Sequence, residues 1–101
     1  MASRLDLQAT LEAILGTREV YFQPPESKKI SYPAIVYSRD HIRNNSANNK
    51  VYIQRDVYQI TVIDSNPESQ YVRAVSQLST ARHIKHFTKD NLNHDVFTIY
   101  L

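Results

Sequence analysis

The chain has 101 residues, of which 42% are apolar and 22% charged, with a formal net charge of +2 and no cysteine. This composition predicts one soluble globular domain over residues 1–101 and excludes a disulfide framework or a thiolate metal site. No apolar run approaches the ~20 residues that span a bilayer, so no membrane partner is expected. The lack of cysteine suits a reducing compartment such as a cytoplasm.

The basic residues are scattered along the sequence, apart from the pair Lys28-Lys29. A surface that binds several phosphates needs a basic stripe, and none is visible in the sequence, so no specific nucleic acid is expected as a partner. The chain has a single glycine, Gly16. Phosphate-cradling loops need several glycines, so P-loop and dinucleotide-binding functions are excluded.

The first predicted element is a helix over residues 3–16. Ser3 can cap its first turn, with Asp6 three residues on in a capping-box arrangement. Gly16 supplies the left-handed backbone that commonly ends a helix. The helix is expected to pack on the core through one apolar face, formed by Leu7, Leu11, Ile14 and Leu15.

Three strands are expected next, over residues 20–22, 32–39 and 50–64. The segment between the last two, residues 41–50, is rich in asparagine and has the composition of a turn. We therefore predict an antiparallel hairpin over about residues 35–63, with residues 41–50 as its polar tip.

The strand over residues 50–64 is too long for its domain. It spans on the order of 50 Å at roughly 3.3 Å per residue, whereas a domain of this size has a diameter of about 34 Å. Residues 57–63 are apolar enough to cross a core, but Gln54, Arg55 and Asp56 place polar groups on both faces. The hairpin is therefore expected to protrude from the body and to contact another chain.

A second helix is predicted to begin at Asn66-Pro67-Glu68, with asparagine as its cap and proline at its first position. Strands over residues 84–88 and 95–101 follow, joined by a turn at residues 90–93. The helix is expected to present a face made of Tyr71, Ala74, Val75, Leu78, Ala81 and Arg82. The resulting fold class is α+β: one small domain, with two helices packed on an antiparallel or mixed sheet and a long protruding β-hairpin.

Histidines near Asp90 and Asp95 invite a metal-site hypothesis, with His83, His86 and His94 as ligands. On a strand, however, residues three apart point to opposite faces, so His83 and His86 are not expected to converge. No zinc-ligand spacing and no hydrolase nucleophile signature is present. We therefore predict no metal, no cofactor and no catalytic residues, and the protein is not expected to be an enzyme.

The hairpin tip is the predicted interface. Its side-chain amides offer many hydrogen-bonding groups, and Tyr52 is of a residue type that is enriched at interfaces. The alternative is a solvated loop, and Tyr37, Tyr58 and Tyr100 are expected to fill the sheet instead. The predicted subunit or partner interface consists of Arg43, Asn44, Asn45, Asn48, Asn49, Lys50, Tyr52 and Arg55.

Three segments together resemble the tail-terminator or tail-completion proteins of long-tailed, siphovirus-type bacteriophages. They are ISYPAIVY at residues 30–37, YQITVID at residues 58–64 and DNLNHDVF at residues 90–97. The similarity covers about residues 28–101. In such proteins a small α+β domain carries a protruding β-hairpin, so the resemblance implies the fold class described above.

The resemblance also implies a function. Such proteins are structural virion proteins that form a homohexameric ring, cap the tail tube at its head-proximal end, stop its polymerisation and provide the head–tail joining surface. The implied partners are further copies of the chain, the tail tube protein and a head-completion or connector protein. The implied location is the head-proximal end of the virion tail, after assembly in the host cytoplasm. Tyr52 and Arg55 would reach a neighbouring subunit or the tube, and the family has no active site to transfer.

Two other functions remain open. One is a head-completion or connector (neck) protein of the same junction, because such proteins are also small. The other is a small nucleic-acid-binding module. The sequence pI near 9.0 and the strands that carry tyrosines suggest it.

Overall fold

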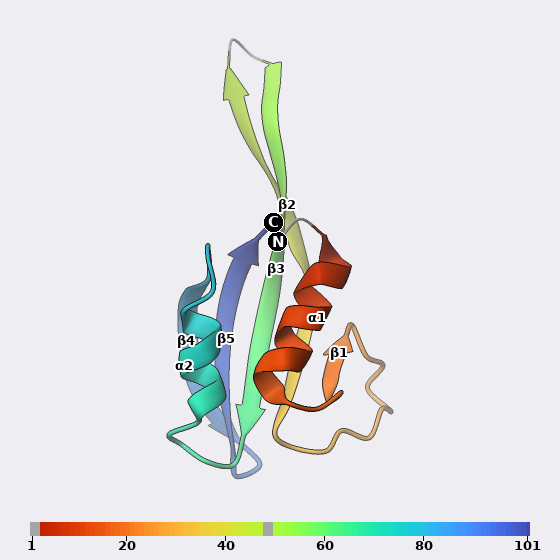
Figure 1. The fold of residues 1–101 in the computed structure, drawn as a ribbon, viewed down its shortest axis with the longest axis vertical. Coiled ribbons are helices and arrows are strands. Elements are labelled where there is room, and N and C mark those ends of the chain that lie inside the picture. Colours follow the sequence, from red (N-terminus) through yellow and green to blue (C-terminus); the bar gives the residue numbers. More distant parts are fainter. Residues whose placement is uncertain (1–2, 48–49) are drawn as a thin grey trace.

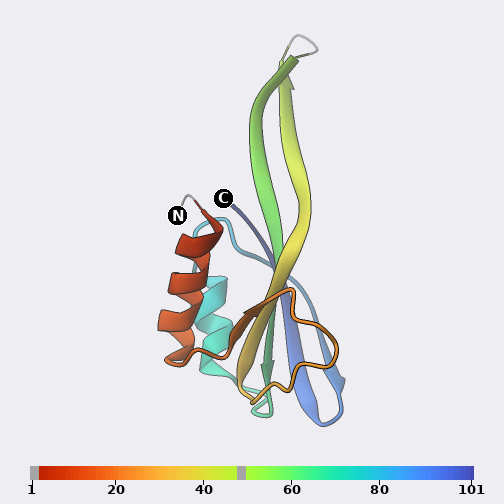
Figure 2. The same ribbon diagram turned by 90° about the vertical axis from the view of Figure 1, so that its right-hand side faces the viewer.

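Two helices pack on one face of a five-stranded mixed sheet (Figures 1 and 2). The computed structural model describes residues 3–47 and 50–101, and for residues 44–47 and 50–53 it describes the backbone. The strand order is β1-β2-β3-β5-β4. In chain order the elements are α1 (Arg4–Leu15), β1 (Val20–Phe22), β2 (Ala34–Ala47), β3 (Lys50–Asp64), α2 (Gln70–Ser76), β4 (Arg82–Lys89) and β5 (Leu92–Tyr100). The predicted α+β class, with two helices on a mixed sheet in one domain, is confirmed.

Helix α1 begins and ends where the sequence predicts. The Ser3 hydroxyl accepts a hydrogen bond from the backbone N–H of Asp6 at 3.2 Å, and Gly16 takes a left-handed conformation with φ 77°. Three leucines, Leu7, Leu11 and Leu15, are buried against the sheet. Burying each one contributes about 1.5–3 kcal/mol, so packing on the sheet is the main source of the helix's stability.

The sheet has five strands over only part of its length. β1 pairs parallel with β2, and β2 pairs antiparallel with β3 along the whole hairpin. β5 pairs with β3 only from Val57 to Asp64, with one more backbone bond from Leu101 to Asp56. Beyond that point, in the described residues, β2 and β3 pair only with each other. We call residues 43–47 and 50–55 the distal ribbon. Figure 1 shows this ribbon running past the N-terminal end of α1 and the C-terminal end of β5.

The predicted turn at residues 41–50 is wrong for residues 41–47. β2 continues as strand to Ala47, which lies opposite Lys50. Backbone pairing with β3 supplies the hydrogen bonds here, and it overrides the turn preference of the asparagines. A register shift between Arg39 and His41 marks a β-bulge at Asp40, where one strand carries an extra residue. Asn48 and Asn49 lie outside the described residues.

The predicted start of the second helix is also wrong. Asn66 accepts a hydrogen bond from the Glu68 N–H at 3.0 Å, but α2 begins only at Gln70, with Ser69 as its N-cap. Asp64 in turn accepts from the Asn66 N–H at 3.1 Å. Two side chains therefore bond to the backbone two residues on, as in Asx turns, and this delays the helix. α2 also ends at Ser76, so the predicted helical face is cut short before Leu78, Ala81 and Arg82.

The last two strands are longer than predicted, because β4 begins at Arg82 and β5 at Leu92. Asp90 and Asn91 both have positive φ, 55° and 63°. That backbone is typical of the two-residue type I′ hairpin turn, which suits asparagine and aspartate. The turn is therefore shorter than the predicted residues 90–93.

The core lies between the helices and the sheet. Leu7, Leu11 and Val75 of the helices meet Ile60 and Phe97 of the sheet in one buried cluster. The rings of Tyr37 and Tyr58 are also buried there, 6.2 Å apart, as predicted, whereas Tyr100 is half-buried. Neither described helix is long and apolar enough to cross a membrane.

Candidate functional site

The distal ribbon differs from the rest of the sheet in having two open edges. In the described part of the chain, no strand pairs with the outer side of residues 43–47 or of residues 50–55. A strand edge without a neighbour presents a row of unpaired N–H and C=O groups, which is a template for pairing with another chain. The ribbon is therefore the first candidate for an interaction site.

At the base of the ribbon two arginines lie against one tyrosine ring. Arg43 and Arg55 are paired directly across the β2–β3 ladder. The guanidinium carbons lie 5.7 Å and 5.6 Å from the centroid of the Tyr100 ring. Each cation–π contact of this kind contributes about 0.5–1 kcal/mol at an exposed site. The tyrosine ring therefore holds two like charges close together.

Neither arginine of this pair has an acidic partner in the described residues, and the sequence has no aspartate or glutamate from residue 41 to residue 55. By contrast, Arg39 forms an ion pair with Asp56 at 3.5 Å, on the other side of the ladder. Like charges directly opposite on neighbouring strands destabilise the pair. An anionic group placed between Arg43 and Arg55 would remove that cost, which makes this cluster a candidate site for a carboxylate or a phosphate.

A second cluster joins two histidines and a buried aspartate. His83 Nε2 and His86 Nδ1 each lie 3.0 Å from the same Asp95 carboxylate oxygen. The expectation that these histidines would not converge is wrong, because a register shift between His83 and Lys85 marks a bulge at Ile84. The extra residue places His83 and His86 on the same face of the sheet. Asp95, 8% exposed, thus has its charge satisfied by two imidazole N–H groups.

These histidines form part of the floor of an open cavity of about 630 Å³ between α2 and the last two strands. Arg73 of α2 and Glu68, which precedes the helix, line its other side, and Phe97 joins the histidines on its floor. Within residues 3–47 and 50–101, no three histidine, aspartate or glutamate side chains are placed to hold a metal ion. The cluster's structural role is to give the Asp95 carboxylate two hydrogen-bond donors beneath this cavity.

Under α1, the hydroxyl of Tyr37 links the helix to the sheet. It donates to the Gln8 side chain and accepts from Arg4 Nη1 at 3.3 Å. Burial raises the pKa of Tyr37 above its ordinary value, and the Arg4 guanidinium opposes that shift. The tyrosine is therefore neutral in the folded protein and acts as a structural hydrogen-bonding group.

The predicted interface residues are distributed unevenly over the described structure. Arg43 and Arg55 are exposed and lie together at the ribbon base. The backbones of Asn44, Asn45 and Lys50 lie in the ribbon strands, as does that of Tyr52. The side chains of these four residues, and all of Asn48 and Asn49, lie outside the described residues.

Sequence reasoning missed Tyr100 as the ring on which both arginines lie, and it missed Asp95 as the shared partner of His83 and His86. The alternation of residues 96–100 places Tyr100 on the opposite face from Phe97 and Ile99. The missing information was the register, which sets Tyr100 opposite Val57, two residues from Arg55. No local pattern in the sequence carries it.

No protein-family model matches this chain, and no curated protein matches it either.

Proposed function

We propose that this protein is a structural subunit of a phage virion. It forms a homohexameric ring on the head-proximal end of the tail tube, where it stops tube polymerisation and offers the joining surface to the head. Its partners are other copies of the chain, the tail tube protein and a head-completion or connector protein. On this proposal the protein has no catalytic role, and it resides in the virion after assembly in the host cytoplasm.

The distal ribbon is the observation that carries the proposal. Its strands pair only with each other over residues 43–47 and 50–55, beyond the end of the five-stranded sheet. A two-stranded hairpin alone in water is marginally stable, and it gains stability from packing against another surface. Beyond the end of the five-stranded sheet, the ribbon would find such a surface on a neighbouring subunit.

Ring closure needs two different surfaces on each subunit that complement one another. The distal ribbon provides one of them. The far edge of the sheet provides another, because β4 is an edge strand whose eight residues are all exposed. Two of these are large apolar side chains, Ile84 and Phe87, which are 50% and 38% exposed. Assembly would cover side chains and strand edges that a monomer leaves in water.

The direct test is the state of the purified protein at high concentration, measured by light scattering and by negative-stain imaging, with and without tail tubes. We expect closed rings, and we expect them at one end of the tubes. A protein that stays monomeric and never binds tube ends would rule the proposal out.

A shortened ribbon tests which part of the chain is responsible. Replacing residues 45–53 with Asn-Gly joins the paired residues Asn44 and Gln54 through a two-residue turn. We expect this variant to lose ring formation while its melting temperature changes little. The matched control is the charge-neutral double variant Glu26→Ser with Lys29→Ser, in the exposed loop before β2, which should still form rings. Equal loss of stability and assembly in the shortened variant would mean that the ribbon belongs to the cooperative fold.

The same reagents separate the proposal from a head-completion or connector protein. That alternative predicts rings that bind the head-side connector but leave the tube ends bare. Binding to tube ends in the absence of any head protein therefore favours the tail terminator.

A further inference from the structure

The two faces of the sheet differ in charge, although the sequence shows only scattered charges. Every second residue of a strand shares a face, so the register assigns each charge to a side. Asp56 and Asp64 of β3 lie an even number of residues from the core residues Tyr58 and Ile60, and Asp95 of β5 lies two residues from Phe97. The three aspartates therefore lie on the helix-covered face.

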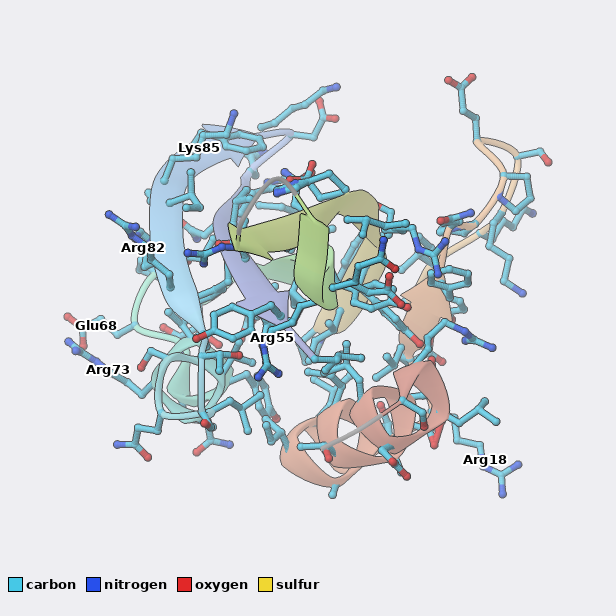
Figure 3. All side chains as sticks on the ribbon, turned by 90° about the horizontal axis from the view of Figure 1, so that it is seen from above. Arg18, Arg55, Glu68, Arg73, Arg82 and Lys85 are labelled. Carbon is cyan, nitrogen blue, oxygen red and sulfur yellow. The ribbon has the colours of Figure 1, made fainter. Side chains whose placement is uncertain are left out.

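On the opposite face, which we call the open face, the charged side chains of β3, β4 and β5 that the structure describes are all cations. Lys89, Lys85 and Arg82 lie opposite Leu92, Val96 and Thr98 of β5. Tyr100 continues this row to the Arg43–Arg55 pair. Figure 3, seen along the long axis, shows Lys85 on the side of the sheet away from the helices and Arg55, at the ribbon base, nearer the helices, because the sheet twists along its length.

The row is long, and the described residues of β3, β4 and β5 place no acidic residue within it. On β2 the open face also carries His41, whose Nδ1 lies 2.8 Å from the Asp40 carboxylate. From Leu92 to Tyr100 the row extends about 27 Å, at roughly 3.4 Å per residue. Between the cations lie half-buried polar side chains, those of Gln59, Thr61, His94 and Thr98. Arginine, lysine and small polar side chains without carboxylates are the groups that contact the phosphate backbone of nucleic acids.

A protein partner fits this surface less well. Protein interfaces have an apolar centre, but three aliphatic residues of the open face on these strands, Val57, Ile63 and Val96, are buried, and Leu92 at its end is half-buried. Phe87 is partly exposed, yet its ring is stacked on that of His94, with the ring centroids 4.7 Å apart. Lys85 Nζ lies 5.5 Å from the centroid of the Phe87 ring. The surface therefore offers charge and hydrogen bonds, without an apolar anchor.

The same contacts distinguish between kinds of nucleic acid. Proteins that bind single strands stack bases on free aromatic faces. Here the ring of Tyr100 is occupied by two guanidinium groups, and that of Phe87 by His94 and Lys85. A duplex keeps its bases paired and presents one charge per ~1.7 Å of its axis, so it needs no free ring.

We propose that the open face binds the phosphate backbone of duplex DNA, without reading its sequence, through Arg43, Arg55, Arg82, Lys85 and Lys89. All of these side chains belong to one copy of the chain, so the inference concerns the free subunit; the ring proposed above would cover the distal ribbon and β4, and with them part of this surface. In the folded protein the binding is electrostatic and is weakened steeply by salt.

The test is fluorescence anisotropy of a short mixed-sequence DNA duplex titrated with the full chain over a series of salt concentrations. The variant Arg82→Gln with Lys85→Gln removes two exposed cations of the open face. We expect its Kd at low salt to rise by about tenfold or more, and the salt slope to become shallower by about 1.8. Arg43→Gln with Arg55→Gln should have a similar effect, which tests the other end of the row.

The matched control is Arg18→Gln with Arg73→Gln, which removes the same charge at exposed positions outside the open face (Figure 3). It should bind within about twofold of the unmodified protein, and melting curves should show that all variants fold. The proposal is overturned if no duplex binds at the lowest salt, or if the control weakens binding as much as the open-face variants. Tighter binding of single-stranded DNA, or equal binding of polyglutamate, would overturn it as well, because the first indicates base stacking and the second an acidic protein partner.

Discussion

The two halves of the β2–β3 hairpin share one hydrogen-bonded ladder but obtain their stability from different sources. In the half nearer the helices, β2 and β3 lie between β1 and β5, and they bury Ile35, Tyr37, Tyr58 and Ile60. In the distal ribbon the two strands have no other strand beside them in the described residues, and Arg43, Gln54 and Arg55 are exposed. Regular strand geometry therefore does not imply a contribution to the core, and mutations in the two halves should have different effects.

The largest expected effect is in the half that packs on the core. Phe97 is fully buried and lies opposite Ile60 of β3. Phe97→Ala should lower the free energy of unfolding by about 3–5 kcal/mol, because it removes the transfer energy of the ring and leaves a cavity. Urea unfolding measures this.

The matched change in the ribbon is Gln54→Ala, which should alter the free energy of unfolding by less than about 0.5 kcal/mol. A large loss there would show that the two halves unfold as one unit and would remove the contrast between them.

The next largest effect concerns the bulged edge of the sheet. Replacing His83 and His86 together with alanine leaves the buried Asp95 carboxylate without its two donors. We expect a loss of about 2–3 kcal/mol at neutral pH, since an unsatisfied buried charge is costly. Adding Asp95→Asn to the double variant should recover part of that loss, and thermal unfolding of the two variants compares them. No recovery would mean that the histidines act by packing alone.

A smaller effect, dependent on pH, is expected under α1. Tyr37→Phe should cost about 1 kcal/mol at neutral pH through its lost hydrogen bonds to Gln8 and Arg4. Burial raises the pKa of Tyr37 in the folded protein, so its neutral form is favoured there. That contribution is fully present below about pH 10, the ordinary pKa of tyrosine, and is lost as the pH rises through the folded pKa.

The advantage of tyrosine over phenylalanine at position 37 should therefore shrink in alkaline solution, as followed by urea unfolding at a series of pH values. Tyr21, whose pKa is raised by its hydrogen bond to the Glu19 carboxylate, is present in both proteins and cancels in the comparison. A constant difference up to high pH would contradict this account.

The smallest effect is expected at the ribbon base. Arg55→Ala removes one cation–π contact with Tyr100 and also the repulsion from Arg43. Each term is below about 1 kcal/mol and they oppose each other, so stability should change by less than about 0.5 kcal/mol. Calorimetry checks this, and a destabilisation above about 1 kcal/mol would mean that the arginine pair supports the fold.

Local signals in the sequence identified most of the elements. Helix α1 has a cap, an apolar face and a terminating Gly16, and all three agree with its structure. The span of β3 follows from its continuous run of strand-forming residues, and Asp90-Asn91 marks the last hairpin turn. These features depend on neighbouring residues only, which is why they can be read from one sequence.

The errors arose where structure depends on pairing between distant residues. Residues 41–47 have the composition of a turn, yet pairing with β3 makes them strand. The bulge at Ile84 reverses the expected orientation of His83 relative to His86. Likewise, scattered cations gather on one face only once the register of β3, β4 and β5 is known. One inserted residue moves every later side chain to the other face, so these sites are sensitive to a detail that composition does not contain.

The position of the hairpin within the sheet has a mechanical consequence. β2 and β3 are inner strands, with β1 on one side and β5 on the other. A pull on the far end of the ribbon, directed along the strands, would slide both of them lengthwise past their neighbours. Such a load is shared by all the flanking backbone hydrogen bonds together and does not open them one after another. A partner bound to the ribbon is thereby connected to the central strands of the domain.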